Sequence, residues 1–149
     1  MTDELTFADV DANVRRAIAA YTQALDDGRT DDVVATFCPD GVVDMGAMGR
    51  HAGHDALRVA YDGWAPRRPQ RHLVLNTHIS DWNDREVRAT SDVVLLRQGS
   101  NGWAVQLVGR YHDLLHHHAG QWRFHERRAE FVEPASAPPP VSGGGRPSG

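Results

Sequence analysis

A tyrosine, an aspartate and a histidine in the first half of the chain have the clearest chemical potential. Tyr21 and Asp26 lie five residues apart in the first segment of helical periodicity, and His72 opens a strand-like segment. A phenol, a carboxylate and an imidazole suffice to polarise a carbonyl group and move a proton, because each exchanges a hydrogen bond with a developing charge. These residue types point to elimination or enolisation without a metal or an organic cofactor.

The first part of the chain, which must position Tyr21 and Asp26, has the pattern of helices. Apolar residues recur at helical spacing from Val10 to Leu25, which predicts an amphipathic helix over about 9–27. Thr6 and Asp9 form a capping-box pattern at its start, and Gly28 is placed to end it in a left-handed conformation. Two shorter helices are expected over about 30–37 and 54–64, with a turn at 39–41 and a short strand at 41–45 between them.

The second half changes to the period of strands. Four strands separated by turn residues are predicted, over 72–82, 86–97, 103–116 and 121–131. Helices followed by an antiparallel meander indicate an α+β fold with the helices packed on one face of the sheet. Residues 134–149 are rich in Pro, Gly and Ser and contain almost nothing to bury, so they are expected to form a disordered tail after a domain that covers 1–133.

The composition excludes several classes of protein. A chain of 149 residues with a formal charge of −4 and interspersed charges lacks the broad basic surface that nucleic-acid binding needs. The first residues are acidic and no segment is apolar for the length of a membrane span, so no membrane partner and no export are expected. Cys38 is the only cysteine, which fits a reducing cytoplasm.

The histidines do not form a recognisable metal motif. His116, His117 and His118 are consecutive, so on a strand their side chains alternate in direction and converge poorly on one ion. The pair His51 and His54 has a spacing that binds zinc in some proteins, but a loop that leads into a helix explains it more simply. Cys38 has no spaced histidine partner in the sequence and is interpreted as a small buried residue. No metal site is therefore expected.

Several of these features together resemble a known family. The helical start with Tyr21 and Asp26, the strand that opens with Arg71 and His72, and a terminal hairpin over 109–127 resemble the NTF2-like superfamily, in particular its SnoaL-like branch, over residues 5–133. The resemblance implies a cone in which a strongly curved, mostly antiparallel sheet and three N-terminal helices enclose a pocket. Within that branch the chain is similar to scytalone dehydratase and bile acid 7α-dehydratase.

The resemblance also implies roles for individual residues. Tyr21, Asp26 and His72 fall on catalytic positions of these dehydratases, with Asp26 orienting His72 and Tyr21 stabilising an enolate oxygen. The expected substrate-binding positions are Met45, Asn76, Ser91, Tyr111 and Asp113. Met45, Ser91 and Tyr111 stand where scytalone dehydratase has other residue types, which argues against scytalone as the substrate. Asn76 is included because regular alternation puts it on one strand face with His72.

Simpler explanations remain open for these residues. Tyr21 is also compatible with a packed position in the core. Asp26 is compatible with a solvated residue at a helix end, and His72 with an exposed residue at the start of a strand. For Asp113, a structural ion pair with Arg127 is the safer interpretation. On an ideal helix, moreover, five residues separate the directions of Tyr21 and Asp26 by about 140°.

The expected function is that of a cofactor-independent lyase, or a related isomerase or cyclase, acting on a hydroxylated carbonyl compound of polyketide or steroid-like type. The alternatives are a non-catalytic module for ligand binding or assembly and the small subunit of a ring-hydroxylating dioxygenase, which has the same fold. Apolar residues on the uncovered sheet face, with Leu73, Leu75 and Leu107 as examples, predict a homodimer or homotrimer.

Overall fold

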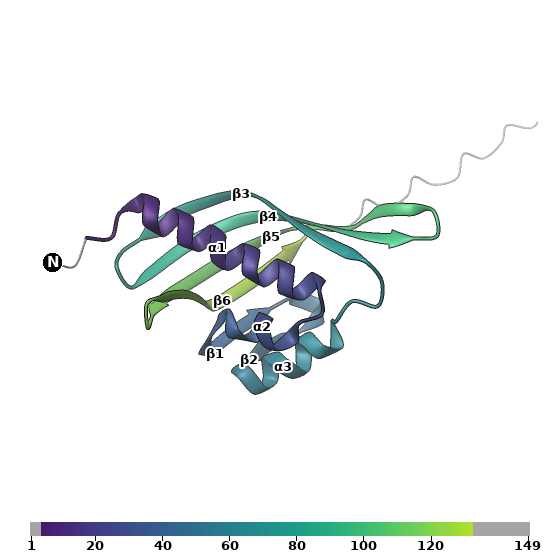
Figure 1. Ribbon diagram of the computed structural model, residues 1–149, viewed down its shortest axis with the longest axis horizontal. Helices are drawn as coiled ribbons and strands as arrows, with labels where there is room; N and C mark the ends of the chain where they lie inside the picture. The colour runs from purple at the N-terminus through teal and green to yellow at the C-terminus, as the bar shows by residue number, and fades with distance from the viewer. Residues whose placement is uncertain (1–3, 133–149) are drawn as a thin grey trace, which may run out of the picture.

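Three helices and a six-stranded sheet make up the computed structural model, which describes residues 4–132 (Figure 1). The tail predicted for 134–149 lies outside the described residues. The elements are α1 (Phe7–Asp26), α2 (Thr30–Ala35), β1 (Phe37–Asp44), a short 3-10 helix η1 (Gly46–Met48), β2 (Arg50–Ala52), α3 (His54–Gly63), β3 (Gln70–Trp82), β4 (Glu86–Gly99), β5 (Gly102–His118) and β6 (Gln121–Phe131).

The first helix forms where the apolar periodicity predicted it, because one stripe of its surface is buried against the sheet. The stripe comprises Val10, Val14, Ile18, Tyr21 and Leu25. The amide of Asp9 donates to Thr6 Oγ1 over 3.2 Å, and the amide of Thr6 donates to the Asp9 carboxylate over 3.0 Å, which completes the predicted capping box. Gly28 follows the helix with φ of +69°, a conformation that glycine adopts without strain.

The other two helices lie beside the edge of the sheet formed by β1 and β2 (Figure 1). Val33 and Val34 of α2 and Leu57 and Tyr61 of α3 bury their side chains in the same core as α1. Within residues 4–132, no helix has the length and apolar character needed to cross a membrane.

The sheet has the strand order β2-β1-β6-β5-β4-β3. Neighbours from β3 to β6 pair antiparallel, as the meander predicted, whereas β1 pairs parallel with β6 and makes the sheet mixed. The predicted α+β fold with a mostly antiparallel sheet is confirmed. It remains open at both edges, since β2 and β3 each have one neighbour.

The turn predicted at 39–41 is wrong, because these residues lie inside β1. The pairing of β1 with β6 shifts register between Phe37 and Val42, so the chain bends there without leaving the sheet. A Cβ atom on Gly41 would come within 2.9 Å of the Cys38 carbonyl oxygen and of the Phe37 Cβ atom. Position 41 therefore requires glycine because the backbone passes close to other atoms at this bulge. Pro39 and Gly41 are typical of turns as well as of bulges, so the sequence alone did not distinguish the two.

The regular alternation expected along β3 is also wrong. Leu75 pairs with Asp92 but His78 pairs with Thr90, and Asn76 between them has φ of +54°. This bulge reverses the faces of the residues that follow, because one extra residue shifts a period of two. His72 and Val74 therefore point toward the helices, whereas Asn76 is exposed.

The face of the sheet opposite the helices carries exposed apolar side chains. Leu73, Leu75, Val105 and Val108 are 42%, 51%, 58% and 43% exposed. Leu107 does not belong to this face, because the register of β4 and β5 shifts between Leu95 and Leu96 and turns Leu107 toward the inside. The expectation for Leu107 is thereby corrected.

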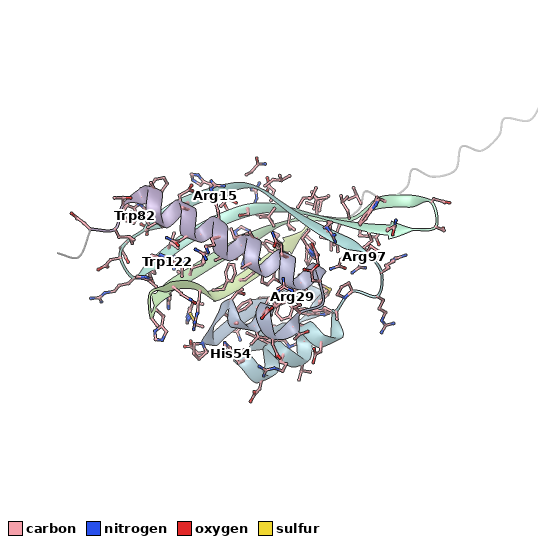
Figure 2. The ribbon with its side chains drawn as sticks, in the orientation of Figure 1. Arg15, Arg29, His54, Trp82, Arg97 and Trp122 are labelled. Carbon is pink, nitrogen blue, oxygen red and sulfur yellow. The ribbon has the colours of Figure 1, made fainter. Side chains whose placement is uncertain are left out.

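The two ends of the body differ in their side chains. Arg97 lies toward one end of the long axis, where the hairpin of β4 and β5 extends beyond the other strands, and Trp122 lies toward the opposite end (Figures 1 and 2). Trp82, at the Trp122 end, packs against Phe7 with ring centroids 6.1 Å apart.

Candidate active site

Asp26 and His72 form a hydrogen-bonded pair that is almost completely enclosed. His72 Nδ1 lies 2.6 Å from Asp26 Oδ1, and the two side chains are 9% and 5% exposed. A carboxylate accepts hydrogen bonds only, so in this pair Nδ1 of neutral His72 carries the proton and Nε2 has a free lone pair. The arrangement is that of an imidazole base held by a carboxylate.

Local structure explains how residues 46 positions apart meet. Asp26 is the last residue of α1, and β3 begins beside it at Gln70. The backbone amide of His72 donates to Asp26 Oδ2 over 2.8 Å, and Gln70 Nε2 donates to Oδ1 over 3.1 Å. With the ring of His72, three donors hold this carboxylate, which fixes the orientation of the imidazole.

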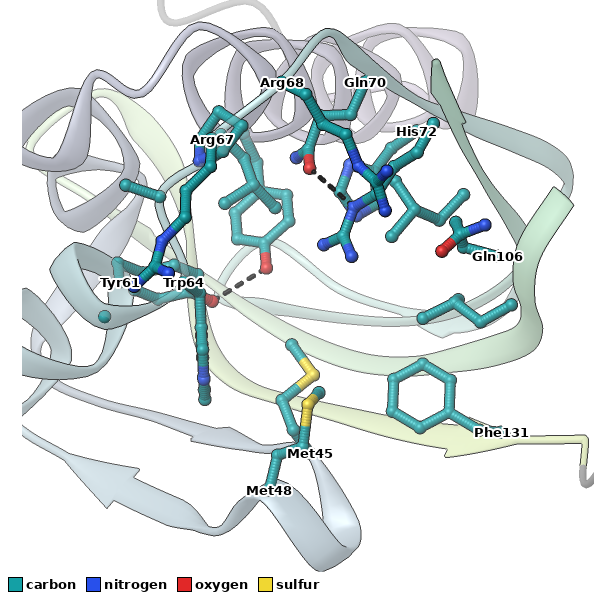
Figure 3. A pocket seen from close by; sticks show the side chains of 18 of the residues that line it. Met45, Met48, Tyr61, Trp64, Arg67, Arg68, Gln70, His72, Gln106 and Phe131 are labelled. Carbon is teal, nitrogen blue, oxygen red and sulfur yellow. Dashed lines mark hydrogen bonds between the residues drawn. The ribbon is translucent and has the colours of Figure 1, made fainter. Parts of the chain in front are cut away.

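A cavity of about 680 Å³ adjoins His72 between α1, α3 and the sheet (Figure 3). The buried residues of its lining are Tyr21, Leu25, Met45, Tyr61, Gln70, Leu95 and Tyr111. Phe131 and Trp64 add aromatic surface. Asp26 does not line the cavity and stands behind His72, so the imidazole is the member of the pair that a ligand would touch.

The hydroxyl groups of Tyr21 and Tyr61 lie 2.7 Å apart, so that one of them donates a hydrogen bond to the other (Figure 3). Burial raises the pKa of Tyr21, and the positive charge of Arg127 offsets part of this rise. Burial also raises the pKa of Tyr61 well above its ordinary value, and the neighbouring Tyr21 hydroxyl raises it further. Both phenols therefore stay protonated at neutral pH, and the pair retains one O–H for a ligand in the cavity.

Arg127 lies behind these tyrosines in the core. Its guanidinium donates two hydrogen bonds of 2.8 Å to Asp113, and both side chains are fully buried. The guanidinium carbon lies 4.3 Å from the ring centroid of Tyr21 and 3.9 Å from that of Tyr111. Burial opposes the charge of Arg127, but Asp113 outweighs it and raises the arginine pKa above its ordinary value. The cation braces the aromatic wall of the cavity.

Three arginines surround the outer part of the cavity. Arg67 and Arg68 come from the segment between α3 and β3, and Arg97 comes from β4. Arg97 Nε donates to Gln70 Oε1 over 3.3 Å, which links it to the carboxylate of Asp26 through Gln70. Within residues 4–132 none of the three forms an ion pair with a carboxylate, so the mouth carries uncompensated positive charge.

Comparison with known proteins identifies the family. The model of the SnoaL-like domain matches residues 8–128. The chain belongs to the SnoaL-like family. The resemblance inferred from the sequence is thereby confirmed. Among curated proteins, none matches this SnoaL-like chain significantly.

Solved structures share the NTF2-like fold of this SnoaL-like protein. A variant of a Mycobacterium tuberculosis protein of unknown function is 22% identical, with a TM-score of 0.77 over 83% of this chain and 72% of that one. A Catenulispora acidiphila protein in complex with S-DNPA is 25% identical, with a TM-score of 0.76 over 83% and 94%. ActVI-ORFA from Streptomyces coelicolor is 20% identical, with a TM-score of 0.74 over 82% and 96%.

Of the residues expected at the site of this SnoaL-like protein, some gather and others do not. Tyr21, His72, Met45 and Tyr111 line the cavity, with Asp26 behind His72. Tyr21 and Asp26 do not converge directly, in keeping with their different directions on the helix: Tyr21 faces the inner cavity and Asp26 reaches β3.

Three expected substrate-binding residues lie outside the cavity lining. Asn76 donates to Asp92 over 2.9 Å on the exposed side of the sheet, where the bulge in β3 has turned it. Ser91 is buried and bonds to Thr77 over 2.9 Å. Asp113 forms an ion pair with Arg127, the structural pairing that was the safer interpretation of the sequence.

Sequence reasoning missed four residues that complete the pocket, namely Tyr61, Trp64, Gln70 and Arg97. Gln70 had a usable signal, because it precedes His72 by two positions and shares its strand face. Tyr61 and Trp64 fall at the end of the helix predicted over 54–64, but their sequence spacing does not reveal that Tyr61 meets Tyr21.

Proposed function

We propose that this SnoaL-like protein is a cofactor-independent lyase that removes water from a hydroxylated carbonyl compound. The observation that carries the proposal is the hydrogen bond between Asp26 and His72 at the wall of the cavity. A buried carboxylate that holds Nδ1 leaves Nε2 as a base directed at whatever the cavity holds. Simple ligand storage does not require that arrangement.

In the proposed reaction His72 Nε2 takes the proton from the carbon next to the substrate carbonyl. The electron pair of that C–H bond forms an enolate, and the negative charge of Asp26 stabilises the resulting imidazolium. His72 then returns the proton to the departing hydroxyl group as the C–O bond breaks, which yields a double bond and water. One group that acts as base and acid on the same side favours syn elimination.

The proposed role of the tyrosine pair is to stabilise the enolate oxygen. One hydroxyl donates to the other, and the hydrogen atom that remains is available to the substrate oxygen. Arg127 supports this role, because its charge opposes the pKa rise that burial imposes on Tyr21 and so strengthens Tyr21 as a hydrogen-bond donor.

The walls of the cavity favour a polycyclic or otherwise extended apolar substrate. Its volume lies within the range of roughly 300–1,000 Å³ typical of small-molecule sites, and Trp64, Phe131 and the tyrosines offer faces for stacking. The arginines at the mouth favour a substrate with an anionic group distant from the reacting carbon. A hydroxylated polyketide acid combines these properties.

Isomerisation and ring closure are the second candidates, because both proceed through the same enolate. A non-catalytic binding module would be favoured by an Asp26 side chain turned to solvent. This carboxylate is instead buried and bonded to His72, which favours catalysis over binding alone.

We further propose a homo-oligomer that covers the exposed apolar sheet face with a second copy of the chain. Leu73, Val105 and Val108 give this face an apolar centre, and Asp92 and Arg110 pair beside it. Such an arrangement of apolar centre and polar rim is common at interfaces between proteins.

The test is a dehydration assay on a panel of hydroxyketones, after a first binding screen that includes S-DNPA. His72→Ala should reduce turnover by roughly a hundredfold to ten-thousandfold. His78→Ala is the matched control, since His78 lies on the same strand and is exposed. Turnover by His72→Ala equal to that of the control would reject His72 as the proton carrier.

A further inference from the structure

A second group of reactive side chains lies on the sheet face opposite the helices. Cys38, His116 and His125 come from the adjacent strands β1, β5 and β6. Each offers one atom able to bind a metal, and the three atoms lie within 4.8 Å of one another. This Cys-His-His cluster lines none of the cavity of the candidate active site and is not used in the proposed reaction.

Bulges in the strands bring the cluster together. Leu115 pairs with Phe124 and Leu114 pairs with Glu126, so His125 is an extra residue in β6. The bulge turns His125 to the outer face, where its ring stacks on that of His116 with centroids 4.1 Å apart. Phe37 of β1 pairs with the buried Phe124, so Cys38 next to it faces outward.

The donor atoms of the cluster have few protein partners. His125 Nδ1 is enclosed and has no hydrogen-bond partner within the described residues. Cys38 Sγ has one weak contact, 3.7 Å from the carbonyl oxygen of Arg123. An enclosed ring nitrogen without a partner loses the hydrogen bond it had in water, and a metal ion would compensate for that loss.

Two carboxylates adjoin the cluster. Asp40 Oδ1 lies 3.9 Å from His125 Nδ1, and Glu86 Oε2 lies 3.6 Å from His116 Nε2. The Asp40 side chain is largely exposed and that of Glu86 about half exposed, and both residues line the same groove as Cys38 and His116. They add negative charge and either can supply a fourth ligand.

The separations are close to those of a metal site. Ligand atoms at roughly 2.0–2.3 Å from a tetrahedral zinc ion lie about 3.3–3.6 Å from one another. The longest distance between two ligand atoms of the cluster must therefore shorten by about one ångström when a metal ion binds. The two rings also have to rotate out of their stack, and they have room to do so, since the side chains of His116 and His125 are 36% and 32% exposed.

We propose that Cys38, His116 and His125 bind a divalent transition-metal ion of the zinc type. One thiolate with two imidazoles selects such ions over magnesium and calcium, which prefer oxygen ligands. On binding, the thiol releases its proton to solvent, and Asp40, Glu86 or water occupies the fourth position. The ion links β1, β6 and β5 and stabilises the edge of the sheet that β1 and β2 form.

The experiment uses the full chain without a polyhistidine tag and Co²⁺ as the spectroscopic probe. One equivalent of Co²⁺ should produce the visible bands of a tetrahedral site together with a charge-transfer band from sulfur to cobalt. Cys38→Ser should abolish the charge-transfer band. A cobalt complex in which this band is absent from the wild-type chain would overturn the proposal.

Zinc affinity provides a second measurement, which is needed because Cys38 is buried and its replacement can disturb folding. His125→Ala should weaken Zn²⁺ binding by more than the roughly 10- to 100-fold that loss of an outer-shell partner costs. His117→Ala is the matched control, because His117 adjoins the cluster in sequence but stacks on Trp122 with centroids 4.9 Å apart. Equal zinc affinities for the two variants would disprove the site.

Zinc should also raise the melting temperature of the wild-type chain, since an ion that binds only the folded state stabilises it. The rise should be reversed by a chelator and be absent in His125→Ala. A zinc-dependent rise of the same size in His125→Ala would likewise contradict the proposal.

Discussion

The hydroxyl oxygens of Tyr21 and Tyr61 lie 2.7 Å apart although the residues are 40 positions apart in the chain. The pair joins the first helix to the third at the inner wall of the cavity. Tyr111 stands beside it with its ring 6.3 Å from that of Tyr21. These are the three tyrosines of the chain.

All three tyrosines should resist ionisation while the protein is folded. Burial raises the pKa of each above the ordinary value of 10.0. The folded state therefore holds more protons than the unfolded state above about pH 10, and stability that is fully present below that pH declines as pH rises beyond it. We expect tyrosinate absorbance to appear together with unfolding, and absorbance that rises before circular dichroism changes would contradict this.

Breaking the buried pair of Arg127 and Asp113 should destabilise the fold strongly. Removal of one partner leaves a buried charge uncompensated, which costs about 3–5 kcal/mol. Arg127→Met should therefore lower the free energy of unfolding by that amount in urea titration. The double variant Arg127→Met with Asp113→Leu should recover much of the loss, and additive losses in the double variant would show that the two residues act independently.

Asp26→Asn should reduce turnover by roughly a hundredfold or more once a substrate is available. The amide keeps the shape of the carboxylate but removes the charge that stabilises the imidazolium of His72. Circular dichroism should stay close to that of the wild-type chain. Asp27→Asn is the control, since Asp27 is the next residue and its side chain is 56% exposed. Similar rates for the two variants would exclude a role for the Asp26 charge.

The arginines at the mouth should favour anionic ligands. Arg97→Gln should weaken binding of 2-naphthoate by about tenfold, the cost of one charge-assisted hydrogen bond, and leave binding of its methyl ester nearly unchanged. Arg16→Gln, on the exposed side of α1, is the control. Calorimetry measures the affinity of each variant for each of the two ligands. Equal losses of affinity for the acid and for its ester in Arg97→Gln would mean that Arg97 shapes the cavity without recognising charge.

A charge on the apolar sheet face should prevent self-association. Leu73→Lys puts an ammonium group at the centre of the proposed interface, where it would lose water without gaining a partner. Light scattering should report an oligomer for the wild-type chain and a monomer for this variant. Val59→Lys on α3 is the control, since Val59 is 75% exposed on another surface. A wild-type monomer at micromolar concentrations would argue against the interface.

The sequence by itself determined the elements whose pattern is local. The helical stripe of α1, its capping box and the order of helices before strands follow from residue spacing alone. Tyr21, Asp26 and His72 were also predicted to be catalytic without the structure, from their residue types and from the family resemblance, and that role stays a prediction. The local elements could be predicted because each depends on residues only a few positions apart in the chain.

Only the tertiary structure decided which side chains meet. A bulge at Asn76 moved that residue away from the cavity, and a bulge at His125 brought it to His116 and Cys38. One extra residue in a strand turns the side chains of all later residues to the opposite face of the sheet. The position of that extra residue depends on pairing with distant strands. Gln70 beside Asp26 and Tyr61 beside Tyr21 likewise depend on the packing of distant elements, because their own sequence surroundings are compatible with many other contacts.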